Sequence, residues 1–433
     1  MLKRILTLAA GTALGLLLAA GALRVTGAWG LWPNRELNRS ADYVREVLKL
    51  VNENYVDATA VGYDKLAHEA IHGVVSSLDP HSEFLAANEF GEFEDDLDGD
   101  FCGIGVQVEL RGEKIVIIAP MAGTPAERAG ILRGDEIVSV DGRPVGVKAP
   151  MDDAIKWLRG KPHSQVVVGI HRPDPDKQME FTLMREVIKV DSVREVQLIE
   201  DHIGYIHLVD FSAHTGEQFL AALDGLLHEG ADALIIDMRN NPGGLLEAAV
   251  EVTEPFFKKG ELVVYTEGRN AADREDLLAE MAGEPVQVPI AVLINAGTAS
   301  AAEIVTGALK DTHRAVIVGE RSFGKGSVQT IFKLRNGEGM RITTARYFTP
   351  GGISIHGKGI APNVEVIMTP EEDNKLRLQR MRNDVTNAAD FKERFGFSPI
   401  EDRQLQAAID VLKGVTLLQT QAGPSGTRQP PRP

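Results

Sequence analysis

Ser300 stands where an apolar run gives way to a helical pattern, a place suited to a nucleophile. Residues 288–294 predict a buried strand, and Ala301–Lys310 follows with the pattern of a helix. The first N–H groups of a helix have no partner within it, and with the helix dipole they can stabilise a developing oxyanion. The same position also suits a serine that only caps the helix, and Ser300 alone favours the cap.

Lys325 shifts that balance toward catalysis, because it lies between Gly324 and Gly326 after a predicted strand at Ala315–Gly319. Glycines on both sides let the backbone approach its neighbours closely and direct the lysine stem inward. A lysine shielded from water loses its preference for the charged form and can accept a serine proton near neutral pH. Gln329, which lies four residues after Lys325, is placed to hold the lysine amine by a hydrogen bond.

A third segment ends in a Gly-Gly turn that can offer a second oxyanion N–H group. The predicted strand Ala233–Met238 runs through Arg-Asn-Asn-Pro into Gly243 and Gly244. A phosphate-binding loop is the competing interpretation. The segment has neither the G-x-x-x-x-G-K nor the G-x-G-x-x-G spacing that such a loop needs.

Two other sets of residues suggest different chemistry. His68, Glu69 and His72 match H-E-x-x-H, which on a helix places two imidazoles on one face for zinc. No third ligand follows at a suitable spacing, so surface histidines on an amphipathic helix are the preferred interpretation. His313 and Asp311 could complete a Ser-His-Asp set, but their position also suits polar groups at a helix end.

Four segments together resemble the carboxyl-terminal processing (tail-specific) protease family. They are Leu78-Asp-Pro-His-Ser82, Asp-Met-Arg-Asn-Asn-Pro-Gly-Gly, Gly-Thr-Ala-Ser-Ala-Ala-Glu-Ile and Phe-Gly-Lys-Gly-Ser-Val-Gln. The resemblance implies an α/β core of crotonase or ClpP type and a Ser300–Lys325 dyad assisted by Gln329. It also implies an oxyanion hole made by the backbone N–H groups of Ala301 and of Gly243 or Gly244. No metal and no organic cofactor is implied.

Residues 125–142 resemble a PDZ domain, mainly β with two helices, inserted before the core. Gly103, Ile104, Gly105 and Val106 then match the loop whose N–H groups receive a peptide's C-terminal carboxylate, with the peptide added as a strand. This implies recognition of protein substrates through their C-termini and endopeptidase cleavage near them. Arg172, at the end of a predicted strand, is a candidate for relaying occupancy to the core. An inactive peptide-binding scaffold is the alternative.

Composition limits the partners and the compartment. The net charge of −16, without a basic stripe among aromatics, argues against nucleic acid. Lys3 and Arg4 precede an uncharged stretch from Ile5 to Leu23, which predicts export as a signal peptide or a retained anchor. We therefore expect a periplasmic protein, or one on the extracytoplasmic face of the inner membrane. An adaptor or a homo-oligomer is a further expected partner.

Changes in pattern along the chain predict its organisation. The expected parts are a signal peptide or anchor at 1–24, an N-terminal helical segment at 36–97, a PDZ domain at 98–187, an α/β protease core at 188–370, a helical segment at 371–416 and a disordered tail at 417–433. The acidic stretch Glu92–Asp100 is interpreted as a solvated linker.

Overall fold

The computed structural model describes residues 34–121, 123–145, 151–334, 336–382, 385 and 387–422. The chain divides into two compact units, one ending at Phe84 and the other beginning at Leu85. In the first unit α2 (Arg35–Asn54) and α3 (Tyr63–Ser76) confirm the predicted N-terminal helices. The predicted signal peptide or anchor lies outside the described residues. Among the residues described, no helix is long and apolar enough to cross a membrane.

A small β domain carries the residues that resemble a PDZ domain. Its sheet has the order β3-β4-β5-β7-β8, and β6 pairs with β5. The strands are β3 (Val106–Arg111), β4 (Lys114–Pro120), β5 (Glu136–Val140), β6 (Arg143–Pro144), β7 (Gln165–Pro173) and β8 (Asp176–Met184). The helices α5 (Pro125–Arg128) and α6 (Met151–Leu158) accompany them, and β2 (Asp100–Gly103) pairs with β9 (Glu186–Lys189). The apolar residues of these elements form a separate core.

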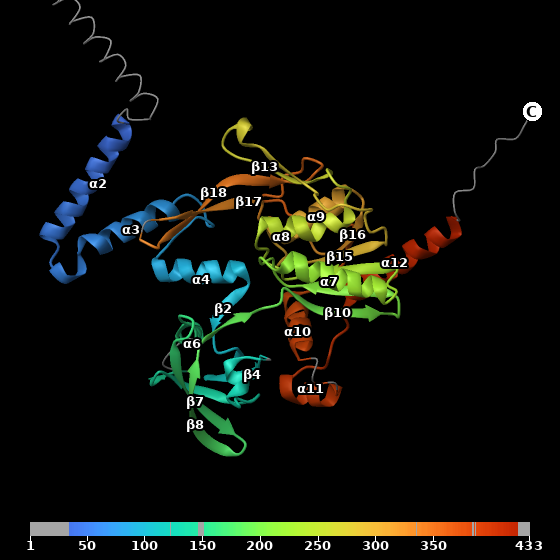
Figure 1. The fold of residues 1–433 in the computed structure, drawn as a ribbon, viewed down its shortest axis with the longest axis horizontal. Coiled ribbons are helices and arrows are strands. Elements are labelled where there is room, and N and C mark those ends of the chain that lie inside the picture. The colour runs from blue at the N-terminus through green and yellow to red at the C-terminus, as the bar shows by residue number, and fades with distance from the viewer. Residues whose placement is uncertain are drawn as a thin grey trace, which may run out of the picture. The chain divides into compact units, whose positions relative to one another are not determined.

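The second unit also contains a six-stranded sheet of order β10-β11-β12-β15-β16-β19. All neighbours are parallel except β10 and β11. The strands are β10 (Val193–Ile199), β11 (Ile203–Leu208), β12 (Ala233–Asp237), β15 (Ile290–Ile294), β16 (Ala315–Gly319) and β19 (Val364–Glu365). The helices α7 (Thr215–His228), α8 (Leu246–Thr253) and α9 (Ala301–Asp311) connect successive strands (Figure 1). The predicted alternation of strands and helices is therefore confirmed.

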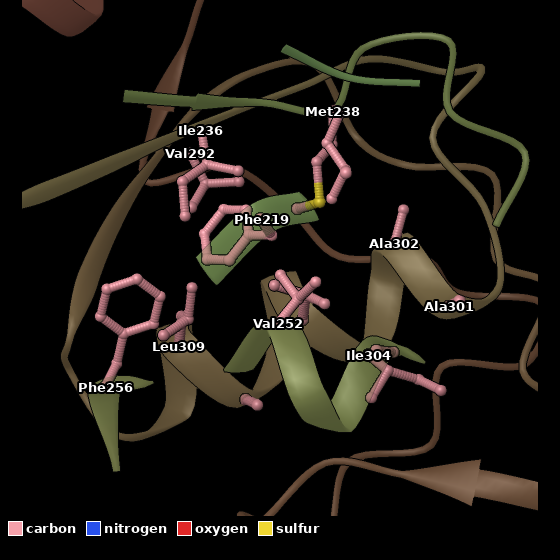
Figure 2. Packing of buried hydrophobic residues seen from close by; sticks show 14 of the residues in the cluster. Phe219, Ile236, Met238, Val252, Phe256, Val292, Ala301, Ala302, Ile304 and Leu309 are labelled. Carbon is pink, nitrogen blue, oxygen red and sulfur yellow. The ribbon is translucent and has the colours of Figure 1, made fainter. Parts of the chain in front are cut away.

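Buried apolar clusters cover both faces of this sheet, which explains why the sequences of its strands are continuously apolar. In β12, Leu234 and Ile236 face the cluster that contains α7, α8 and α9, while Ile235 faces the cluster that contains the C-terminal helix. Figure 2 shows part of the first cluster, where the side chains of α9 lie among those of its neighbours. The labelled members are Phe219, Ile236, Met238, Val252, Phe256, Val292, Ala301, Ala302, Ile304 and Leu309. This packing fixes both ends of α9.

A second sheet and three helices complete the unit. The antiparallel strands β13 (Leu262–Glu267), β14 (Glu275–Leu278), β17 (Ser327–Lys333) and β18 (Gly339–Phe348) belong to that sheet. The C-terminal segment forms α10 (Pro370–Met381), α11 (Ala388–Phe395) and α12 (Arg403–Ala422). Ala408, Ile409 and Leu412 of α12 are buried against the central sheet.

Two expectations about local structure are wrong. The acidic stretch is not a linker, because most of it lies in α4 (Ala87–Asp98). Its apolar members explain the helix: Phe90 is buried, and Phe93 and Leu97 are half-buried. The predicted tail also begins too early, since α12 continues to Ala422. The remainder of that tail lies outside the described residues.

Candidate active site

Ser300 occupies the N-cap position of α9 in an unusual backbone conformation. Its φ is 55° and its ψ is −120°, and only 5% of the residue is exposed. Positive φ is rare for residues other than glycine and costs of order 1–3 kcal/mol, so the surrounding structure must impose it. Strand β15 and helix α9, both buried, hold the two ends of the turn. Such strained residues concentrate at functional sites.

Glu303, in the first turn of α9, links the serine segment to the lysine segment. It is completely buried, and its Oε2 accepts hydrogen bonds from the backbone N of Ser300 at 2.9 Å and of Lys325 at 2.8 Å. Its Oε1 accepts from the backbone N of Gly324 at 2.7 Å and from Ser322 Oγ. Burial raises the pKa of Glu303, and these hydrogen bonds oppose the rise. One carboxylate thus holds two distant segments together.

Lys325 is half-buried, and burial lowers its pKa from the ordinary lysine value. The nearby charge of Arg341 lowers it further, whereas Glu303 acts in the opposite direction. The flanking glycines are required by close approach: a Cβ on Gly326 would lie 2.3 Å from the backbone N of His356. Gly324 has φ +93°. The environment therefore favours a neutral amine, the form that can accept a proton.

The distance between the two segments suits proton transfer. Because the amide nitrogens of Ser300 and Lys325 each lie within about 3 Å of one oxygen atom, they lie within about 6 Å of each other. The flexible four-carbon stem of lysine can span such a gap. Within the described residues, no hydrogen bond joins the Lys325 amine to Ser300 or Gln329. Gln329 donates from Nε2 to Ser327 Oγ at 2.8 Å, and its Oε1 is the atom that could accept from an ammonium.

The Gly-Gly turn lies against Ser300. A Cβ on Gly243 would meet Ser300 Cβ at 2.6 Å and the backbone N of Ala301 at 2.8 Å. The N–H of Gly243 donates to Asn241 Oδ1 at 2.8 Å. Among the described residues neither Ala301 nor Gly244 has an acceptor for its N–H. In the parallel bridge with Phe211, the Gly243 carbonyl and the Leu245 amide point toward Phe211, so the Gly244 N–H points away from it.

Two residues beside Ser300 were missed in the sequence. Glu303 carried a usable signal, since Ser-x-x-Glu before an apolar run is the pattern of a capping box. Tyr347, in β18, gave none: its hydroxyl lies within hydrogen-bonding reach of Ser300, although β18 belongs to a different sheet from β15, the strand that precedes Ser300. Burial raises the pKa of Tyr347 to about 12, and the contact with Ser300 opposes that rise.

The structure separates the other candidate sets from Ser300. Asp311 and His313 lie at the far end of α9, an eleven-residue helix that is about 16 Å long. Asp311 there accepts a hydrogen bond from the amide of Gly351 at 3.0 Å. In α3, the Nδ1 of His68 lies 2.6 Å from the carbonyl oxygen of Asp64. No group of three or more His, Cys, Asp or Glu residues among those described is arranged to hold a metal ion.

The predicted carboxylate-binding loop has the backbone that such a role needs. Gly105 has φ +76°, and a Cβ there would lie 2.3 Å from Thr124 Cβ. Thr124 Oγ1 donates to the Gly105 carbonyl at 3.2 Å, which fixes the turn. All four residues of the loop, from Gly103 to Val106, line a cavity together with Ile155 of α6.

Arg172 is held within the β domain. Its Nε donates to Asp135 Oδ1 at 2.7 Å and its Nη2 to Oδ2 at 2.8 Å, and Asp135 is buried. The hydrogen bond with Asp135 raises the pKa of Arg172. A role in relaying occupancy to the core stays a prediction.

Comparison with known proteins identifies the families of two parts of the chain. Residues 202–366 match the model of peptidase family S41, and residues 116–172 match that of the PDZ domain. A carboxy-terminal-processing protease of Bartonella bacilliformis is 35% identical over 431 residues, which cover 96% of both chains. A probable CtpA-like serine protease of Staphylococcus epidermidis is 35% identical over 78% of this chain and 67% of the relative.

Solved structures include the photosystem II D1 C-terminal processing protease. It is 30% identical, with a TM-score of 0.44, over 75% of this chain and 92% of that chain. The fold and the sequence together define a serine-type peptidase with a PDZ domain. The chain belongs to the carboxy-terminal-processing proteases of family S41.

Proposed function

We propose that this protease cleaves peptide bonds by attack of Ser300 Oγ, with Lys325 as the base. One observation carries the proposal: the backbone N–H groups of Ser300 and Lys325 both donate to the carboxylate of Glu303. This carboxylate holds the strained serine close to the partly buried lysine. A neutral Lys325 amine takes the serine proton as Oγ bonds to the substrate carbonyl carbon. The resulting ammonium then protonates the leaving amine, and an acyl-enzyme remains on Ser300.

Water completes the reaction by the same route. Lys325, neutral again, accepts a proton from the water that attacks the acyl carbon, and the second tetrahedral species releases the new carboxyl group as Ser300 regains its proton. In both tetrahedral species the N–H groups of Ala301 and Gly244 stabilise the oxyanion. We choose Gly244 over Gly243 because the Gly243 N–H is already bonded to Asn241. Gln329 Oε1 holds the ammonium between the steps.

The core is proposed to be of the crotonase or ClpP type. Support comes from its mostly parallel sheet, in which the nucleophile follows β15 and the oxyanion turn follows the neighbouring strand β12. The carboxyl ends of adjacent parallel strands meet at one edge of a sheet, which brings the two loops together.

The PDZ domain is proposed to bind the C-terminus of the substrate and to gate the protease. The loop from Gly103 to Val106 supplies the N–H groups for a carboxylate, and the apolar lining at Ile104, Val106 and Ile155 suits an apolar terminal side chain. A peptide with a free apolar C-terminus should be cleaved tenfold to a hundredfold better than its amide, because about 1–3 kcal/mol of charge-assisted binding is lost. Equal kcat/KM values for the two peptides would contradict the proposal that the PDZ domain recognises the terminal carboxylate.

Export is proposed from the sequence of the first residues. Lys3 and Arg4 followed by the apolar stretch 5–23 direct the chain to the extracytoplasmic side, as a cleaved signal or an anchor. Cell fractionation with detection of the mature N-terminus tests both alternatives, and a full-length cytoplasmic pool would contradict export.

The catalytic assignment is tested by four variants of the full chain. Ser300→Ala and Lys325→Ala should each abolish peptide hydrolysis, while His313→Ala and His72→Ala should retain most of it. The acyl-enzyme formed with a slowly hydrolysed ester should appear in the mass spectrum of the parent protein and be absent from Ser300→Ala. Substantial turnover by Lys325→Ala would show that another group is the base.

A further inference from the structure

The loop that leads to the Gly243-Gly244 turn is tethered by buried charges from the C-terminal segment. Arg239 lies just after β12 and is only 4% exposed, and Asp237, at the end of that strand, is completely buried. Two partners come from far along the chain: Arg380 in α10, with 19% of its side chain exposed, and Asp402 just before α12, with 13% exposed. The four groups form a network with two positive and two negative charges.

Arg239 stands at the centre of this network. Its guanidinium donates to Asp237 through Nε to Oδ1 at 2.9 Å and Nη2 to Oδ2 at 2.6 Å. It also donates to Asp402 through Nη1 to Oδ1 at 2.8 Å and Nη2 to Oδ2 at 2.9 Å. Both pairs have two parallel hydrogen bonds, the arrangement that fixes orientation most strongly. The side chain that precedes the Gly-Gly turn is therefore held in one position.

Arg380 closes the network from α10. Its Nη1 donates to Asp237 Oδ2 at 2.9 Å, and its Nη2 donates to Asp402 Oδ2. The loss of one partner would leave an uncompensated charge in a buried place, which strongly disfavours the present arrangement. Arg239 would then have to move or draw in water.

A second contact extends from α10 to the segment that carries Ser300. Asn295 directly follows β15, and its Oδ1 accepts the backbone N–H of Asn240 at 2.8 Å. Its Nδ2 donates to Asn240 Oδ1 at 3.1 Å and to Asp373 Oδ1 at 3.2 Å. Asn240 has φ 58°, so this pair also holds a backbone that is unfavourable for an ordinary residue. The oxyanion turn and the serine turn are thus linked to each other and to α10.

We propose that Arg380 and Asp402 are positioning residues for the reaction, acting through Arg239 to hold the Gly243-Gly244 turn against Ser300. This inference rests on the proposed role of that turn as an oxyanion hole. Donors of an oxyanion hole must be fixed before charge develops, so a loosened turn lowers transition-state stabilisation more than substrate binding. The C-terminal segment is then a part of the catalytic apparatus that touches no substrate.

The experiment uses the full chain with Asp402→Asn and Arg380→Gln. Lys413→Gln is the matched control, because it removes an exposed ion pair between Glu200 and α12, the helix that follows Asp402. We expect kcat to fall at least tenfold in the first two variants with KM changed less than twofold, and no change in the control. Binding of a peptide boronic acid, which mimics the tetrahedral species on the serine, should weaken by the same factor as kcat. Asp402→Glu, which retains the charge, should recover part of the loss.

A purely stabilising network would give a different pattern. Each variant is therefore assayed well below its unfolding temperature, with the folded fraction measured by circular dichroism. If folded Asp402→Asn retains the parent kcat and boronate affinity, the inference is wrong. Should that variant fail to fold, folded Arg380→Gln provides the second test, and an unchanged kcat and boronate affinity there would be equally contradictory. Ser300→Ala, assayed in parallel, shows separately whether the proposed nucleophile is correct.

Discussion

Ser300 and Lys325 are held by the same atom: their backbone N–H groups both donate to Oε2 of Glu303. Neither a Glu303→Gln nor a Glu303→Ala side chain can accept all four hydrogen bonds that the carboxylate accepts. We expect Glu303→Gln to lower kcat/KM tenfold or more and the free energy of unfolding by about 1–3 kcal/mol. Steady-state kinetics and chemical denaturation measure the two effects.

Asp311→Asn is the control for that prediction. Asp311 lies at the other end of α9 and also accepts a backbone N–H group, from Gly351. Its substitution should leave kcat/KM within about twofold, because the site is about 16 Å away. If Asp311→Asn lowered kcat/KM as much as Glu303→Gln, the loss of activity would have to be explained by a general disturbance of α9 and not by the contacts of Glu303.

The pH dependence should depend on Arg341. In the proposed mechanism Lys325 must be neutral to accept a proton, so we expect kcat/KM to rise with pH through the pKa of Lys325. Arg341 lowers that pKa because a second positive charge nearby disfavours the ammonium. Arg341→Gln should therefore move the rise to higher pH, with lower activity at neutral pH and a similar plateau in alkali. Arg274→Gln removes an exposed cation paired with Asp276 and should leave the profile in place. A rise in the same position for Arg341→Gln would contradict this account.

Alanine substitutions at Gly243 and at Gly230, its matched control, test the proposed oxyanion turn. Both have positive φ, +92° and +99°, but a Cβ on Gly243 would collide with Ser300 and one on Gly230 would meet nothing within 4 Å. Gly230→Ala should lose only about 1 kcal/mol of stability with normal kcat. Gly243→Ala should lose activity by a hundredfold or more. Equal kcat values in the two variants would contradict the close approach at Gly243.

The backbone conformation of Ser300 should lower the stability of the folded protein. Because its φ is positive, glycine is better suited than alanine to this position. Among inactive variants, Ser300→Gly should be more stable than Ser300→Ala by about 1 kcal/mol, measured by thermal unfolding. The reverse order would mean that the turn relaxes once the hydroxyl is removed.

The sequence predicted the elements with strong local patterns and missed contacts made across long distances. The strand Ala315–Gly319 is found with the predicted bounds, and the strand from Ala233 and the helix from Ala301 each end within one residue of the prediction. The acidic stretch in α4 was misread because charge density concealed a helix with one buried face. The proximity of Tyr347 to Ser300 depends on how two separate sheets pack together, which no local spacing encodes. The position of Glu303 beside Ser300 could have been predicted, because its spacing from Ser300 is that of a capping box.

The ion pair between Arg239 and Asp402 joins positions 163 residues apart. Closing a loop of that length costs conformational entropy before any contact is gained, so such pairs form late in folding. During synthesis, moreover, the ribosome releases the glycine turn well before the aspartate that completes its tether. A newly made chain therefore passes through an interval in which the sheet, the serine and the lysine are present and the turn is still untied. If the tether positions the turn as proposed, proteolysis begins only once the C-terminal helices have docked.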